Sequence, residues 1–112
     1  MDIAVEELAA GITKIVLHGR LDTTRALVTE LPFNKVITSK RRIVVDLSNV
    51  TFLSSYAIRI LLVGAKIVDS KGGKLVISCP DGNVAKVLKT AGTGALIPVF
   101  PTEAAAVSAL KS

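Results

Sequence analysis

The sequence predicts a single α/β domain with a mixed, mostly parallel sheet of four to five strands and about four helices. Three observations predict it. The chain has 112 residues, half of them apolar, which is one domain's worth of chain with enough apolar surface for a core. Runs rich in Val, Ile and Leu alternate with segments of helical periodicity. No long linker, repeat or low-complexity segment interrupts this alternation, so we expect one domain over residues 1–112.

Two β-rich segments open the chain, Ile3 to Leu8 and Ile12 to His18. Between them, Ala9-Ala10-Gly11 suits a short turn, so the two segments are predicted to form a hairpin. Gly19-Arg20-Leu21-Asp22 then ends the second strand.

A first helix is predicted next. Thr23 or Thr24 suits its N-cap, because a threonine oxygen can accept a hydrogen bond from a free backbone N–H. Pro32 predicts that the helix ends near Leu31, since proline disfavours a helix interior.

The middle of the chain holds a buried strand and a long helix. Ile43 to Leu47 is nearly continuous in apolar residues, which is typical of a central strand covered on both faces. After Ser54-Ser55, a periodic apolar segment from Tyr56 to Val68 is predicted to be helical and to end at Lys71-Gly72-Gly73.

The remaining elements complete the alternation of strands and helices. In order they are a strand at Lys74 to Ser78, a helix entered through Pro80-Asp81-Gly82 with Val84, Val87, Leu88 and Ala91 on one face and Gly92 after its end, a short edge strand at Leu96 to Phe100, and a helix capped by Thr102 that runs through Leu110. Right-handed crossovers make strands two, three and four parallel. The loops that follow them then gather at one end of the sheet, where ligands and partners of such folds are usually bound.

Composition excludes several function classes. One Cys and one His rule out an internal disulfide and the ordinary zinc ligand sets, and we expect no metal or cofactor. The formal charge is +5, but only Lys40-Arg41-Arg42 forms a basic cluster and no aromatic residue is interleaved with it. We therefore expect no direct nucleic-acid contact. The start of the chain is acidic and its longest apolar stretch, Tyr56 to Ala65, is too short for a membrane span, which predicts a cytoplasmic protein.

Enzymatic chemistry finds little support. Cys79 is expected to be a buried inert thiol, because His18 ends a different strand and cannot be assumed to serve it as a base. Asp22 and Asp46 follow or end strands and could face one another as paired carboxylates, although turn and cap hydrogen bonding is the simpler interpretation. A small α/β enzyme or nucleotide-binding domain that uses these carboxylates and the serines stays one hypothesis, weakened by the missing base and phosphate loop. We expect no catalytic residue.

Ser54 and Ser55 stand at the first turn of the long helix. One serine is enough to cap a helix, which leaves the other free. A phosphate there would add roughly −1.5 to −2 charges beside unpaired N–H groups, with Arg59 one turn on as its counter-ion.

Two apolar stripes run along the same helix. Ile58, Leu61, Leu62 and Ala65 form the stripe that must face the sheet. Tyr56, Ile60, Val63 and Ile67 form a second stripe, which is either covered by a neighbouring helix or exposed as a docking surface.

The segment from Val50 to Leu62, with the sequence VTFLSSYAIRILL, resembles the helix-start motif of STAS domains, the family of bacterial anti-sigma factor antagonists. Common forms of that motif read V-x-F-M-D-S-S-G-L and F-I-S-S-A-G-L-R-V-L-L. Gly19-Arg20-Leu21-Asp22 is similar to the family's G-E-L-D, and Val44 to Ser48 to its V-x-D-L-S. The resemblance spans the whole chain and implies a STAS-like fold.

The resemblance also implies a regulator that switches partners. In the family, the unphosphorylated protein binds an anti-sigma factor serine kinase and frees the sigma factor, phosphorylation abolishes binding, and a phosphatase restores it. Ser55 matches the phosphoacceptor of the S-S-A-G form, Ser54 the Asp of the other form, and Arg59 the family arginine. We expect the chain to be a monomer or weak dimer. The partner surface expected for it comprises Asp22, Asp46, Ser54, Ser55, Tyr56, Arg59, Ile60, Val63 and Ile67.

Two positions depart from the motif. Tyr56 stands where the D-S-S-G form has its phosphorylated second serine, and Ala57 stands where glycine is usual. They motivate a second hypothesis, a constitutive STAS interaction subunit of a lipid-transporter ATPase or a stressosome-like complex.

Overall fold

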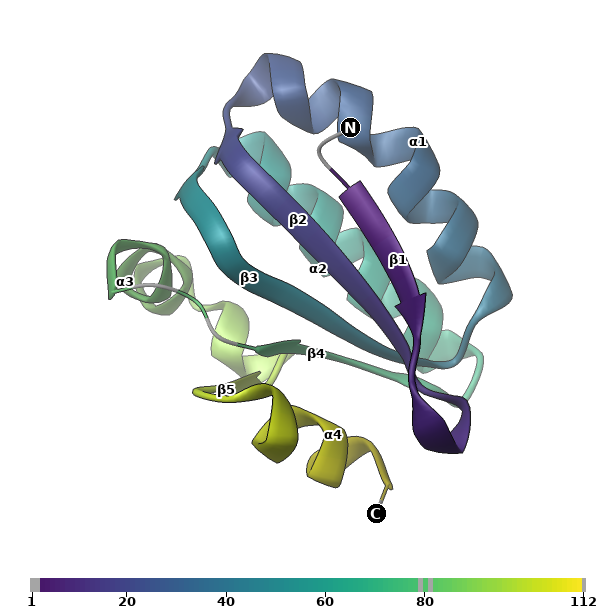
Figure 1. The fold of residues 1–112 in the computed structure, drawn as a ribbon. Helices are drawn as coiled ribbons and strands as arrows, with labels where there is room; N and C mark the ends of the chain where they lie inside the picture. Colours follow the sequence, from purple (N-terminus) through teal and green to yellow (C-terminus); the bar gives the residue numbers. More distant parts are fainter. Residues whose placement is uncertain (1–2, 79, 81, 112) are drawn as a thin grey trace.

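The structure is a computed structural model that describes residues 3–78, 80 and 82–111 (Figure 1). The predictions made for Cys79 and Asp81 lie outside these residues. Strands and helices alternate after an opening hairpin, in the predicted order.

One five-stranded sheet organises the described part of the chain, with strand order β1-β2-β3-β4-β5. Strand β1 pairs antiparallel with β2, and β2, β3 and β4 pair parallel, as predicted. Strand β5 also pairs parallel with β4. The strands are β1 (Ile3–Glu7), β2 (Thr13–Leu21), β3 (Arg42–Leu53), β4 (Lys74–Ser78) and β5 (Val99–Phe100).

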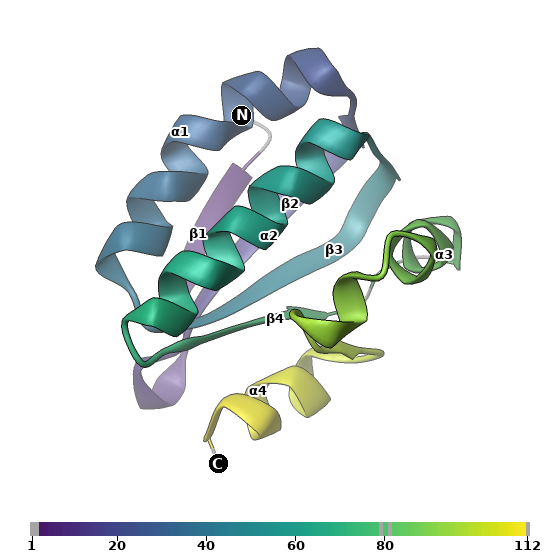
Figure 2. The same ribbon diagram turned by 180° about the vertical axis from the view of Figure 1, so that it is seen from behind.

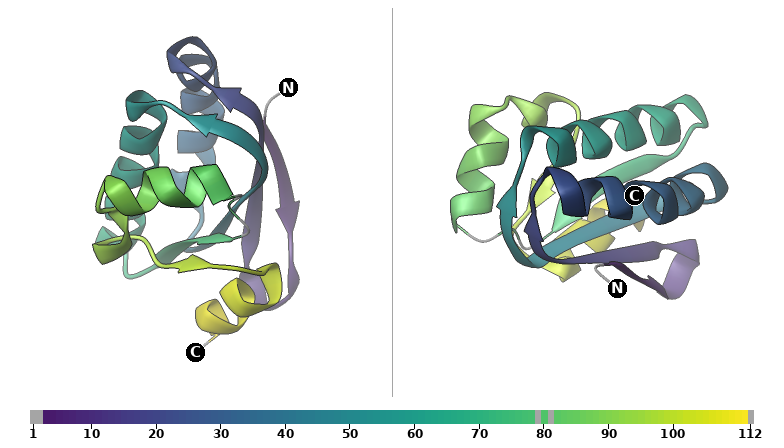
Figure 3. Two further views of the ribbon diagram at one scale, coloured as in Figure 1. Left: turned by 90° about the vertical axis from the view of Figure 1, so that its left-hand side faces the viewer. Right: turned by 90° about the horizontal axis from the view of Figure 1, so that it is seen from above.

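The helices cover the two faces of the sheet unequally. Helices α1 (Thr23–Ser39) and α2 (Ser55–Ser70) lie side by side over one face (Figure 2), and Figure 3 shows this layer edge-on. Helix α3 (Gly82–Thr90) packs against β3, and α4 (Glu103–Lys111) covers the other face near β4 and β5. The larger apolar core lies beneath α1, α2 and α3, and a smaller one lies beneath α4.

Helix α1 does not end before Pro32, as the sequence predicted. It continues to Ser39 with Pro32 inside it. The added turns bury Phe33 and Ile37 completely. Burial of two such side chains is worth about 1.5–3 kcal/mol each, which offsets the roughly 3 kcal/mol that an internal proline costs.

The predicted N-cap of α1, Thr23 or Thr24, was also wrong. Asp22 holds that position, and its Oδ1 accepts a hydrogen bond from the Arg25 N–H at 2.9 Å. Both Thr23 and Thr24 lie inside the helix.

Strands β2 and β3 are longer than predicted. Strand β2 continues past His18 to Leu21, and β3 continues past Leu47 to Leu53. Their pairing is irregular between Val16 and His18 and again after Gly19, whose φ of +82° lies in the left-handed region. Such irregularities let polar and glycine residues stay inside paired strands, so these residues do not end β2 or β3.

The C-terminal third agrees more closely with prediction. Gly92 adopts the left-handed conformation after α3, and Thr102 caps α4 by accepting a hydrogen bond from the Ala105 N–H at 3.1 Å. Strand β5 is shorter than predicted, and Ala91 is exposed beyond the end of α3.

Candidate functional site

The start of α2 lies at the C-terminal ends of β2 and β3. Ser54 joins them, because its N–H donates a hydrogen bond to the Leu21 carbonyl at 2.9 Å. The Ser54 Oγ accepts a hydrogen bond from the Ala57 N–H at 3.2 Å, so Ser54 is the N-cap of α2. The cap needs the Ser54 hydroxyl and leaves Ser55 free, as the sequence indicated.

Ser55 is the first residue of α2 and is exposed. Among the residues that the structure describes, its hydroxyl has no hydrogen-bond partner. The first turn of α2 contains no acidic residue, so the positive end of the helix dipole is not compensated there. Arg59, also exposed, follows one turn later on the same side of the helix. An anionic group on Ser55 would meet both.

Tyr56 connects α2 to α1. Its hydroxyl donates a hydrogen bond to Glu30 Oε1 at 2.5 Å. This bond to a carboxylate raises the pKa of the Tyr56 phenol, and partial burial and the charge of Glu30 raise it further while Arg59 opposes them. Around the pair runs a groove lined by Glu30, Asn34, Tyr56, Arg59, Ile60 and Val63.

The second apolar stripe of α2 is divided between the two alternatives that the sequence left open. Ile60 is buried beneath α1, whereas Val63 remains 43% exposed. Tyr56 and Ile67 are partly buried at the edge of the core. The stripe is therefore mainly a contact with α1, and Val63 is its most exposed member. In the stripe predicted to face the sheet, Leu62 is only partly buried.

The two candidate carboxylates are not brought together. Asp22 caps α1 beside the site, since it follows Leu21, whose carbonyl binds Ser54. Asp46 lies midway along β3, opposite Val16, and accepts a hydrogen bond from the Ser48 N–H at 2.8 Å. Its other oxygen lies 3.6 Å from Lys14 Nζ, which also binds Glu103 of α4. Asp46 thus belongs to the α4 side of the sheet and not to the start of α2.

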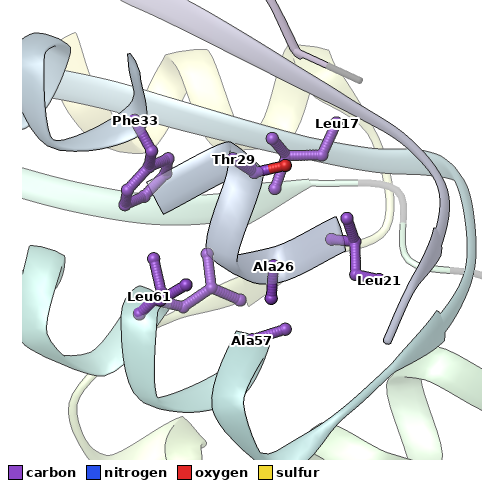
Figure 4. Close-up of a pocket in the computed structure, with 8 residues that line it drawn as sticks. Leu17, Leu21, Ala26, Thr29, Phe33, Ala57 and Leu61 are labelled. Atoms are coloured by element: carbon purple, nitrogen blue, oxygen red, sulfur yellow. The ribbon is translucent and has the colours of Figure 1, made fainter. Parts of the chain in front are cut away.

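A small apolar cavity lies between α1, α2 and β2 (Figure 4). Its walls include Ala26, Phe33, Ala57 and Leu61, and the hydroxyl oxygen of Thr29 points toward Leu17. That hydroxyl is buried and has no hydrogen-bond partner. The cavity offers no group for acid–base chemistry. Within the described part of the chain, no three His, Cys, Asp or Glu side chains are placed to hold a metal ion.

Sequence reasoning missed Glu30 and the Leu21 carbonyl. Glu30 lies 26 residues before Tyr56, and only the packing of α1 on α2 brings them into contact. A backbone carbonyl leaves no trace in a sequence pattern. Neither partner carried a signal that could have found it.

The STAS domain family model matches residues 5–106. The chain belongs to the STAS domain family. It is 24% identical to the anti-sigma F factor antagonist of Paenibacillus polymyxa, over 99% of this chain and 97% of that protein. It is 31% identical to BtrV of Bordetella bronchiseptica, which is described as a proposed anti-sigma factor antagonist, over 91% of this chain and 89% of BtrV.

Solved structures agree on the fold of this STAS domain. The anti-sigma factor antagonist SpoIIAA in its unphosphorylated form superposes with a TM-score of 0.79 and 19% identity, covering 97% of this chain and 96% of SpoIIAA. The phosphorylated form of SpoIIAA from Bacillus superposes with a TM-score of 0.72 and 18% identity, covering 96% and 97% of the two chains. In the described residues of this STAS domain, no helix has the length and apolar character needed to cross a membrane.

Proposed function

We propose that the chain is an anti-sigma factor antagonist that works by partner switching, with Ser55 as its phosphoacceptor. The unphosphorylated protein binds an anti-sigma factor serine kinase in the cytoplasm. The kinase transfers the γ-phosphoryl group of ATP to the Ser55 hydroxyl, which loses its proton, and ADP leaves. The phosphorylated protein is released, and a serine phosphatase restores it.

The observation that carries this proposal is the division of labour between the two serines. Ser54 is partly buried and its Oγ is engaged in the cap, whereas Ser55 is exposed and unbonded among the described residues. A kinase can therefore reach the Ser55 hydroxyl without opening the helix. The relatives named as anti-sigma factor antagonists support the proposed role, and the solved phosphorylated form of SpoIIAA supports control by phosphorylation.

Phosphorylation at Ser55 would change the docking surface by charge. The phosphate adds roughly −1.5 to −2 charges next to the free N–H groups of α2 and within reach of Arg59. A kinase surface that fits the neutral Ser55 and the cationic Arg59 would then face a dianion and a neutralised arginine. Repulsion between the phosphate and the acidic groups that a kinase would place against Arg59, together with altered hydrogen bonding, weakens such a contact.

The test is phosphorylation by the cognate anti-sigma factor kinase with ATP, followed by mapping of the phosphate by mass spectrometry. We expect one phosphate, on Ser55. Ser55→Ala should abolish it, whereas Ser54→Ala should retain it on the neighbouring residue. No phosphate on the wild-type chain, together with stable kinase-independent binding of a transporter ATPase or a stressosome-like scaffold, would favour the constitutive interaction subunit.

A further inference from the structure

The positive charge of the chain is concentrated at one end of the molecule. Three segments that are far apart in sequence meet there: the connection from α1 to β3, the connection from α2 to β4, and the end of α4 (Figure 1). These segments, together with the first residues of β3 and β4, contribute six of the 14 basic residues, namely Lys40, Arg41, Arg42, Lys71, Lys74 and Lys111. Two acidic residues, Glu7 and Asp69, lie among them. Most of the formal charge of +5 therefore belongs to this end, which we call the basic end.

A groove crosses the basic end. Its rim is formed by Arg41, Arg42 and Lys74, and α4 contributes Ala109 and Leu110. Gly73 keeps the two connecting segments close, because a Cβ placed there would lie 2.2 Å from the Arg41 carbonyl oxygen. The Lys74 N–H donates a hydrogen bond to the same carbonyl at 2.7 Å. The backbone thus fixes the spacing of Arg41 and Lys74.

The basic side chains divide into those used by the fold and those left over. Lys71 Nζ donates hydrogen bonds to the carbonyls of Ile37 and Lys40, at 2.6 and 3.1 Å, and so ties down the end of α1. Lys40 pairs with Glu7, and Arg42 donates a hydrogen bond to the Ala10 carbonyl. Arg41 and Lys74 are exposed, and neither side chain has a partner among the residues described.

We propose that this groove binds an acidic, extended polypeptide segment of a protein partner. Two unpaired cations at fixed spacing complement closely spaced carboxylates, and a concave groove suits a single chain better than a planar bilayer does. The groove lining contains no aromatic residue, on which single-stranded nucleic acid would depend for base stacking.

The basic end lies at the opposite end of α2 from Ser55. Helix α2 begins at Ser55 and ends at Ser70, next to Lys71 and to the connection that leads to Lys74 at the start of β4 (Figure 2). The acidic segment and the kinase therefore do not compete for the same surface. The protein can hold one partner through its charge while the other is exchanged at Ser55.

The test is fluorescence anisotropy of a labelled decaglutamate peptide with the full chain at about 150 mM salt. At this salt concentration, interactions between charges more than about 8 Å apart are largely screened. The key variant is Arg41→Glu/Lys74→Glu. The matched control is Lys86→Glu/Lys89→Glu, which changes the net charge equally at exposed residues of α3. We expect the groove variant to lose about tenfold or more in affinity, as attractive pairs become repulsive, and the control to stay near wild type.

Three results would overturn this inference. One is an equal loss in the groove variant and the α3 control, which would reduce the effect to net charge. Another is the absence of peptide binding by the folded wild-type chain. The third is tighter, groove-dependent binding of single-stranded oligothymidylate or of phosphatidylglycerol vesicles. Ser55→Ala should bind the peptide as wild type does, so failure here is separable from failure of the Ser55 assignment.

Discussion

Replacing each serine of the pair by alanine separates the cap from the free hydroxyl. Ser54→Ala removes the acceptor of the Ala57 N–H, a bond of 3.2 Å at a partly buried position. Losing a serine cap typically costs about 1 kcal/mol, within a range of about 0.5–2. Ser55→Ala removes no hydrogen bond that the structure shows, and alanine is the better helix former by a few tenths of a kcal/mol. Its expected effect is zero to slightly stabilising.

Urea unfolding followed by circular dichroism measures the difference. For a domain of this size the free energy of unfolding falls by about 1–3 kcal/mol per molar urea. Ser54→Ala should therefore lower the midpoint by about 0.3–1 M while Ser55→Ala leaves it unchanged. Ser54→Asp is the control, because aspartate caps as well as serine does and also suits the positive end of α2. Equal losses for the two alanine variants, or a larger loss for Ser55→Ala, would refute the division of labour between them.

Three further predictions concern the surroundings of the site and the basic end. Thr29→Val should stabilise the fold by about 1 kcal/mol or more in chemical denaturation, because a buried hydroxyl without a partner carries an uncompensated desolvation cost. Tyr56 is the only tyrosine, so ultraviolet titration should show its pKa above 10.0 in the wild type and nearer 10.0 in Glu30→Gln. Since the folded pKa is raised, this pair should stabilise the fold below about pH 10 and lose that contribution as the pH rises further. Gly73→Ala should cost at least about 2 kcal/mol in thermal or chemical unfolding, because its Cβ would overlap the Arg41 carbonyl.

Each of these has a result that would count against it. A valine at position 29 that destabilises would mean that the threonine hydroxyl is paired after all. Identical tyrosine titrations in wild type and Glu30→Gln would contradict the hydrogen bond between Tyr56 of α2 and Glu30 of α1. For Gly73, the control is Gly82→Ala, where an added Cβ meets nothing within 4 Å. Equal stability of the two alanine variants would contradict the close approach.

The order of elements and the direction of the strands were predictable, because hydrophobic periodicity and glycine or proline signals act locally. The extent of α1 was not. Pro32 is a local stop signal, but Phe33 and Ile37 gain more by burial than the proline costs, and that gain exists only once the sheet is present. The same limit applies to β3, whose continuation to Leu53 depends on its pairing with β2.

The site was predictable in part, for related reasons. Ser54, Ser55 and Arg59 fall on one helix start, so their relation follows from helix geometry alone. Asp46 was misplaced, since strand position alone does not say which face of a sheet a side chain serves. Only part of the basic end could be found from the sequence. Lys40-Arg41-Arg42 is contiguous and was recognised as a basic cluster, whereas Lys71, Lys74 and Lys111 join it only in the fold.

The central claim is that a phosphate on Ser55 controls partner binding. Its most direct test is the dissociation constant of the purified anti-sigma factor kinase for the unphosphorylated chain and for the same chain phosphorylated on Ser55. We predict that phosphorylation weakens binding by about tenfold or more, a loss of about 1.4 kcal/mol or greater. Equal affinity of the two forms would contradict the claim.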